Sequence, residues 1–259
     1  MKRLPTSRSQ RGYDRLARFY QPLEWLVYGD RLQSARTALI AELPPWDRLL
    51  VLGDGDGRLL ERLVADQIHS LTRRDVVKGT GNGMGTGRDE VKQARDWKVT
   101  SVDQSTRMLR RQRSRTARLV GTDHIEFICA DAVSFTPQKQ AYDIIVTPFF
   151  LDCFGEAELD VLLPQWLSGL RPGGTLYHVD FIVPRQAWQR VRAQALLWTM
   201  HVFFRWQTGL ENPSLVDTES AIERCGLRKA AEHISGSGML ASQIWRCRPV
   251  PLGTRPTSM

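Results

Sequence analysis

The 259-residue chain has few cysteines, and their spacing argues against a structural metal site. None of the four belongs to a Cys-x-x-Cys pair: they are Cys129, Cys153, Cys225 and Cys247. Because structural zinc sites usually draw ligands from such pairs, no metal is expected. Few, unpaired cysteines are typical of proteins kept in a reducing compartment, so the expected location is cytoplasmic.

The chain also lacks a long apolar run. No stretch reaches the ~18 residues expected of a membrane span, and residues 1–5 lack the apolar region of a secretory signal. The nearest candidate is residues 195–204, which lie between Arg192 and Arg205. Two interpretations of this segment stay open. It is either a helix packed over a pocket, or a surface that admits a lipid-like substrate or contacts a membrane interface.

Acidic residues are outnumbered by basic ones, 28 to 36, which gives a net charge of +8. Six arginines gather in residues 107–118. On a helix, one face would carry Arg107, Arg111, Arg115 and Arg118. Such a face can meet phosphates, but no aromatic residues alternate with the arginines, as they do in single-strand platforms. A solvated helix face is therefore favoured, and the sequence holds no other nucleic-acid signal.

What the chain does have is a glycine-rich turn after a short apolar run. Residues 49–52 read Leu-Leu-Val-Leu, and the glycine turn (residues 53–57) reads Gly-Asp-Gly-Asp-Gly. Apolar residues at helical spacing follow: Leu59, Leu60, Leu63 and Val64. This order predicts strand, tight turn and helix, as at the nucleotide-binding corner of an open α/β sheet. A dinucleotide fingerprint is excluded, because the third glycine comes one residue early.

Later strands end in residues that suit a nucleotide. Residues 98–102 form a β-rich run that ends at Asp103, where an acid can bind ribose hydroxyls. Residues 125–130 form a third β-rich run, which is followed by Asp131, and residues 142–146 form a fourth. Because ligands bind at the carboxyl ends of such strands, one sheet edge is expected to hold Gly53, Asp103, Asp131, Thr147 and Asp180.

The motifs resemble, in order, those of the class I S-adenosylmethionine (SAM) dependent methyltransferases, over residues 46–181. The resemblance implies an α/β fold: a seven-stranded, Rossmann-like sheet with helices on both faces, whose last two strands form a hairpin over residues 227–246. It implies SAM as cofactor, with Asp131 contacting the adenine amino group. The implied cofactor-binding residues are Gly53, Asp54, Gly55, Gly57, Asp103, Gln104, Met108, Asp131, Ala132 and Thr147.

One position departs from the family pattern. The family has an acid two residues before the first glycine, where it helps to hold the methionine end of SAM, and this chain has Val51 there. That role is left to Asp54, Asp56 or the N-terminal segment. The departure also keeps open the alternative of a non-catalytic SAM-binding or scaffold homologue.

A second departure is the length between Gly53 and Asp103, which exceeds the usual ~20 residues. The excess is residues 69–96, whose glycine-rich part cannot bury a core, so a flexible surface insertion is expected. A mobile lid or a partner-binding loop is the functional alternative. The expected organisation is an N-terminal helical lid (1–45), a methyltransferase domain (46–248) and a C-terminal tail (249–259). The lid loosely resembles that of the ubiquinone/menaquinone C-methyltransferases.

The resulting expectation is a SAM-dependent methyltransferase for a small, apolar or aromatic acceptor. Residues 149–154 contain three phenylalanines that would enclose such a molecule. Asp152 in this segment is the expected catalytic base, required only if the acceptor nucleophile carries a proton. His178 and Asp180 are the other candidates. An RNA methyltransferase, favoured by the arginine-rich segment, stays an alternative.

Overall fold

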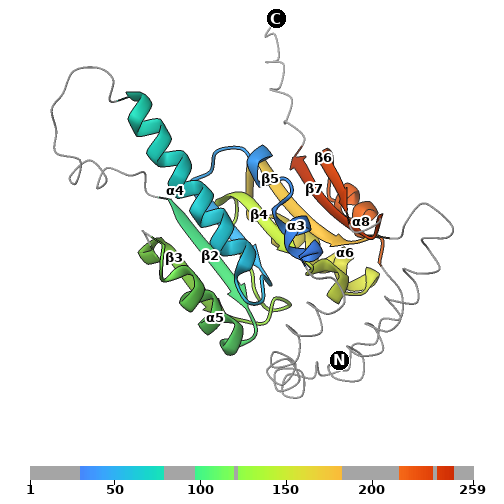
Figure 1. Ribbon diagram of the computed structural model, residues 1–259. Helices are drawn as coiled ribbons and strands as arrows, with labels where there is room; N and C mark the ends of the chain where they lie inside the picture. Colours follow the sequence, from blue (N-terminus) through green and yellow to red (C-terminus); the bar gives the residue numbers. More distant parts are fainter. Residues whose placement is uncertain (1–29, 79–96, 120–121, 183–215, 236–237, 248–259) are drawn as a thin grey trace, which may run out of the picture.

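The computed structural model describes residues 30–78, 97–119, 122–182, 216–235 and 238–247 (Figure 1). They form one seven-stranded sheet with the strand order β3-β2-β1-β4-β5-β7-β6. The strands are β1 (Arg48–Leu52), β2 (Lys98–Asp103), β3 (Ile125–Cys129), β4 (Tyr142–Pro148), β5 (Leu170–Phe181), β6 (Leu227–Ser235) and β7 (Leu240–Cys247). The first five strands pair in parallel, whereas β7 pairs antiparallel with β5 and with β6. The predicted Rossmann-like sheet and its closing hairpin are confirmed.

Helices cover both faces of this sheet. The front face in Figure 1 carries α3 (Arg31–Thr37), α4 (Arg58–Lys78) and α5 (Thr106–Thr116). The opposite face carries α6 (Glu156–Leu167) and α8 (Thr218–Arg224). Three short 3-10 turns, η1 (Ile40–Glu42), η3 (Thr122–His124) and η4 (Leu151–Cys153), complete the described elements.

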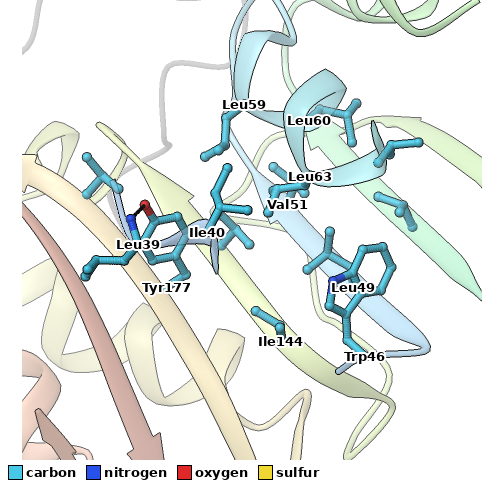
Figure 2. Close-up of a cluster of buried hydrophobic side chains, with 14 of the residues drawn as sticks. Leu39, Ile40, Trp46, Leu49, Val51, Leu59, Leu60, Leu63, Ile144 and Tyr177 are labelled. Carbon is cyan, nitrogen blue, oxygen red and sulfur yellow. Dashed lines mark hydrogen bonds between the residues drawn. The ribbon is translucent and has the colours of Figure 1, made fainter. Parts of the chain in front are cut away.

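Strand β1 is buried on both sides, which explains its continuous apolar run. Leu49 and Val51 face α3 and α4, while Leu50 and Leu52 face the α6 side. Figure 2 shows the first of these two cores, in which Val51 lies among leucines of α4 and Ile40 of η1. The position where the family has an acid is therefore the centre of an apolar core.

The second core lies between the sheet and α6. Trp166 of α6 is almost fully buried, and its ring lies 5.1 Å, centroid to centroid, from the rings of both Phe150 and Phe154. Its indole N–H donates to the carbonyl of Ala132. These contacts join the segment after β4 to the segment after β3, which are neighbours only in space.

Several segments interpreted from sequence lie outside the described residues. They include the lid residues 13–28, the apolar run 195–204, the tail 249–259 and residues 79–96 of the expected insertion. Helix α4 continues to Lys78, so it extends ten residues into the segment 69–96 that the sequence assigned to the insertion. Within the described ranges, none of the helices has the length and apolar character that a membrane span requires.

Substitutions on α6 should separate core packing from surface effects. Leu163 is 1% exposed and Val161 is 68% exposed on the same helix. We expect Leu163→Ala to lower the free energy of unfolding by about 2–5 kcal/mol, because it leaves a cavity in the second core. Val161→Ala should change it by less than about 0.5 kcal/mol. Urea unfolding measures both, and equal effects would contradict the placement of α6.

Candidate functional site

The carboxyl ends of the parallel strands meet at one edge, as the sequence predicted. The amide of Gly53 donates to the carbonyl of Val102 at 3.0 Å, which aligns the ends of β1 and β2. The amide of Ala130 donates to the carbonyl of Asp103 at 3.2 Å, which does the same for β2 and β3. This edge therefore carries the glycine turn, Asp103 and Asp131 side by side.

All three glycines of the turn adopt left-handed backbone conformations, with φ of +71° at Gly53, +64° at Gly55 and +87° at Gly57. Their surroundings differ. A Cβ at Gly53 would lie 2.5 Å from the Phe150 ring, and one at Gly57 would lie 2.9 Å from the Gln112 Cα. A Cβ at Gly55 would meet nothing within 4 Å. The turn is thus closely packed at both ends and open at its middle glycine, as a backbone that receives a ligand must be.

Helix α5 fixes the turn through two side chains. Gln112 is fully buried, accepts a hydrogen bond from the Ser101 hydroxyl at 2.7 Å and donates to the Gly55 carbonyl at 2.9 Å. Arg115 donates to the carbonyl and to the carboxylate of Asp56, both at 3.1 Å. Sequence reasoning missed Gln112. The available signal was a glutamine at helical spacing from the apolar Leu109, which places a polar side chain on the buried face of α5.

The arginine-rich segment is not a uniform solvated face. Arg115 also lies 3.5 Å from the Glu61 carboxylate, so it joins α5 to α4. The guanidinium carbon of Arg113 lies 5.2 Å from the centre of the Phe127 ring on β3. At least these two arginines have structural partners, which weakens the case for an open phosphate-binding surface.

Asp54 belongs to the turn, and its side chain is buried, with 4% of the residue exposed. Its Oδ2 accepts the amide of Leu60 at 2.9 Å and so satisfies an N–H group in the first turn of α4. Its Oδ1 is buried and has no hydrogen-bond partner among the described residues. Burial raises the pKa of Asp54 from 3.8 to about 7, although the Leu60 amide and the Arg36 guanidinium act in the opposite direction. A buried carboxylate with one unused oxygen is costly to retain unless something binds it.

Arg36, in the last turn of α3, is a charged residue that is only 6% exposed. Its carbonyl accepts the Tyr177 hydroxyl at 2.8 Å, and the neighbouring Ala35 carbonyl accepts the Ser242 hydroxyl at 2.6 Å. The guanidinium carbon lies 4.9 Å from the centre of the Phe149 ring. The end of α3 is therefore bound to β5 and β7, and this anchoring places Arg36 near Asp54.

Phe149 itself has an unusual backbone, with φ of +51°. Its amide donates to the Val179 carbonyl at 2.7 Å, and its ring packs 5.1 Å from that of Phe181. A bulky residue in the left-handed region is strained, and such strain is retained where surrounding contacts enforce it. The conformation directs Phe149 towards Arg36 on one face while Phe150 lies under Gly53 on the other.

The remaining residues predicted to bind a cofactor lie around the same edge, with one exception. Asp103 accepts the Ser105 amide at 2.8 Å, and Asp131 accepts the Val133 amide at 3.0 Å, so both carboxylates order the chain that follows their strands. Gln104 follows Asp103, Met108 lies in the first turn of α5, and Ala132 follows Asp131. Thr147 differs, because it is 1% exposed and its hydroxyl lies 3.1 Å from Nδ1 of His178.

A second polar group lies at the ends of β4 and β5. Asp180 is 1% exposed, and its Oδ2 accepts the amide of Asp152 at 3.1 Å. The Cys153 thiol donates to Asp152 Oδ1 at 3.6 Å. Burial and the Asp152 carboxylate raise the pKa of Asp180 well above its usual range. The structure thus brings Asp152 against Asp180, two of the three residues considered as a base, at the ends of β4 and β5.

His178, the third candidate, is held inside the fold. Its Nδ1 faces the Thr147 hydroxyl, and its Nε2 lies 3.2 Å from the Thr218 hydroxyl and 3.7 Å from Asp180 Oδ2. Burial lowers the pKa of His178 from 6.5 to about 4, so the ring is neutral at pH 7. Hydroxyls can donate or accept, so both ring nitrogens are satisfied in either tautomer. His178 is a structural residue beneath Asp180.

Parts of the chain are similar in sequence to known methyltransferases. A family model described as a methyltransferase domain matches residues 79–174, which begin after the glycine turn. Trans-aconitate 2-methyltransferase of Streptomyces avermitilis is 33% identical over 141 residues, 52% of this chain and 51% of the relative. The enzyme of that name from Streptomyces coelicolor is 38% identical over 98 residues, 36% of this chain and 31% of the relative. The chain spans about half, or less, of these curated relatives.

A solved structure extends the likeness to nearly the whole chain. N-methyltransferase NodS from Bradyrhizobium japonicum, in complex with S-adenosyl-L-homocysteine, aligns with a TM-score of 0.57. The alignment covers 93% of this chain and 100% of that chain at 14% identity. At this identity the likeness shows a shared fold and does not assign roles to single residues.

The burial of Asp54 predicts a pH-dependent stability that Asp54→Asn should remove. Between the ordinary value of 3.8 and the folded pKa of about 7, the unfolded chain loses this proton while the folded chain keeps it, so wild-type stability falls as pH rises. A shift of about three units corresponds to at most about 4 kcal/mol. The neutral His178 gives the opposite slope but is present in both proteins and cancels in their difference. Urea unfolding from about pH 4 to pH 8 measures this difference, and parallel curves would refute the burial of an ionisable Asp54.

Proposed function

We propose that this chain, a class I SAM-dependent methyltransferase by fold and by sequence, transfers the methyl group of SAM to a small acceptor. The observation that carries the proposal is the open glycine at the centre of a turn whose two ends are closed. The turn lies at the carboxyl edge of a parallel sheet, where open α/β folds bind nucleotide ligands.

The residues at this edge fit SAM. Gly55 leaves the backbone open to a ligand, and Asp103 at the end of β2 is the acid that would receive the ribose hydroxyls. Asp131, two residues after β3, would contact the adenine, and the unused oxygen of Asp54 suits a cationic group. When bound, SAM supplies a methyl group made electrophilic by its sulfonium.

The chain's own contribution to transfer is then to orient the acceptor and to receive a proton. Alignment of two reactants is worth several kcal/mol of barrier, so a shaped pocket is the main requirement. For an acceptor that carries a proton, we propose Asp152 as the base. Asp152 follows β4, at the edge where the parallel strands end, and its amide is held by the buried Asp180 carboxyl.

The acceptor is proposed to be small and largely apolar. Support comes from the aromatic segment after β4, where the ring of the half-buried Phe154 packs 5.2 Å from that of the buried Phe150, since ligand pockets are commonly lined by such side chains. An RNA acceptor would depend on the arginines of α5, of which Arg115 and Arg113 already have partners within the protein. A scaffold without catalysis remains the rival that Val51 suggests, and methyl transfer itself decides between the two.

Three glycines provide a matched test of cofactor binding. Gly55, Gly173 and Gly226 all have left-handed φ, and a Cβ at each would meet nothing within 4 Å. Changing any of them to alanine should cost a similar ~1–2 kcal/mol of stability from backbone strain. Gly173 lies between the paired residues Leu170 and Thr175 near the start of β5, and Gly226 directly precedes β6, so both are at the opposite edge of the sheet.

We expect only Gly55→Ala to weaken SAM binding, by at least about tenfold, because only its methyl group would occupy ligand space. Isothermal titration with SAM measures the affinity of all three variants. Equal losses in the three would mean that strain, and not ligand contact, governs binding. No binding by the wild type would remove the proposed function.

Asp152→Asn tests the proposed base. Labelled methyl transfer into a cell extract at saturating SAM should slow by ~10²–10⁴-fold for a protic acceptor, with SAM affinity unchanged. Asp160→Asn is the control, because Asp160 is an exposed carboxylate of α6 that lies 2.7 Å from Arg224. The labelled pool, lipid-soluble, water-soluble or RNA, identifies the acceptor class. Label in RNA would reject the small acceptor.

A further inference from the structure

Gln112 of α5 connects the glycine turn to strand β2. Gln112 and Ser101 are both fully buried. The Gln112 side-chain nitrogen donates to the Gly55 carbonyl at 2.9 Å, and its oxygen accepts the Ser101 hydroxyl at 2.7 Å. Both ends of this amide are therefore engaged within the protein.

The chemistry of the two partners fixes which way the Gln112 amide faces. A backbone carbonyl can only accept a hydrogen bond, so the nitrogen must face Gly55 and the oxygen is left for the Ser101 hydroxyl. The short reach of the side chain requires α5 to lie close to the turn. Gly57 allows this approach, because a Cβ there would lie 2.9 Å from the Gln112 Cα.

The bond to the Gly55 carbonyl also fixes one peptide plane of the turn. In a trans peptide the C=O and the following N–H point in opposite directions. A glycine permits its neighbouring peptide planes to rotate at low steric cost, so Gly55, with φ of +64°, does not select one orientation by itself. Because Gln112 draws the carbonyl towards α5, the N–H of Asp56 is directed to the other side.

We propose that Gln112 is a positioning residue for SAM, whose amide selects the orientation of the Gly55–Asp56 peptide that the cofactor binds. The inference rests on the proposed function and adds to it a residue of α5, outside the glycine turn. It concerns cofactor affinity, so it can be tested without an acceptor.

Gln112→Glu makes the donor to Gly55 depend on pH. The protonated side chain of this variant still donates to the Gly55 carbonyl and accepts from Ser101, whereas the ionised one has no donor and repels the carbonyl. Ligand affinity should therefore be retained at low pH and lost as pH rises through the pKa of the new carboxyl, which burial raises above the ordinary 4.3.

Isothermal titration with S-adenosylhomocysteine measures the affinity of the variant relative to the wild type, in which Asp54 titrates as well. We expect a loss of less than about threefold at about pH 5 and of at least about tenfold at about pH 8.

Gln67→Glu is the matched control. Gln67 is a buried glutamine of α4 whose side-chain nitrogen donates to the Trp46 carbonyl at 2.8 Å, before β1 and at the opposite edge of the sheet. The change places an acid against a buried carbonyl in the same way, so the stability of both variants should fall as pH rises. The ligand affinity of Gln67→Glu should stay within about twofold of the wild type at both pH values. Urea unfolding confirms that each variant is folded where its affinity is measured.

The other outcomes separate this inference from the proposed function. If the wild type does not bind the ligand, the proposed function fails. If the wild type binds and both glutamate variants show the same pH dependence, Gln112 serves stability alone and the positioning role is wrong. A Gln112→Glu affinity that follows the wild type at both pH values would also overturn it.

A second pair of variants replaces the first if Gln112→Glu does not fold. Gln112→Met removes both hydrogen bonds at nearly the same side-chain length, and Gln67→Met does so at the control position. At a single pH we expect at least about tenfold weaker ligand binding for Gln112→Met and less than about twofold for Gln67→Met. Equal losses in the two would refute the positioning role.

Discussion

The close approach of Gln112 to Gly57 is the contact on which the geometry of the site depends. No side chain fits between them, since a Cβ on Gly57 would lie 2.9 Å from the Gln112 Cα. That approach allows the Gln112 amide to reach the Gly55 carbonyl while its oxygen holds Ser101 of β2. The turn, the second strand and α5 are therefore fixed as one unit. The backbone at Gly55 is therefore held in place by a side chain of α5.

The two acids of the turn, Asp54 and Asp56, have different structural roles. Asp56 compensates two arginines and joins α5 to the start of α4, whereas Asp54 caps α4 from below and retains one unused oxygen. Two residues of the same type, two positions apart, have different chemistry because one is buried. The apolar Val51 fits this arrangement, because a charge at its position would lie in the packed core of Figure 2.

Much of the fold was predictable from sequence because its signals are local. Apolar runs and the glycine turn predicted the succession of strands along the chain, and Asp103 and Asp131 predicted which edge of the sheet carries the candidate site, whereas the seven-stranded sheet was implied by the family resemblance. Gln112, Arg36 and Phe149 were not predictable in their roles, because each acts through residues distant in the chain. Arg36 contacts Phe149 and Tyr177, more than a hundred positions away, and Thr147 turned inward to His178 because the hydrogen-bond partner lay on the neighbouring strand. Local sequence patterns predict where strands and turns lie, whereas the contacts of each side chain depend on residues that are distant in the chain.

Phe150 has a consequence for how this protein can diversify. Its ring lies under Gly53 and also packs against Trp166 and Phe154, so one side chain belongs to the cofactor turn, to the second core and to the segment after β4. A change that enlarges or shrinks it would act on all three at once. A new substrate range is therefore harder to reach through this position than through a residue with fewer contacts. Substitutions are easier to accommodate at side chains that contact only one of these parts of the fold.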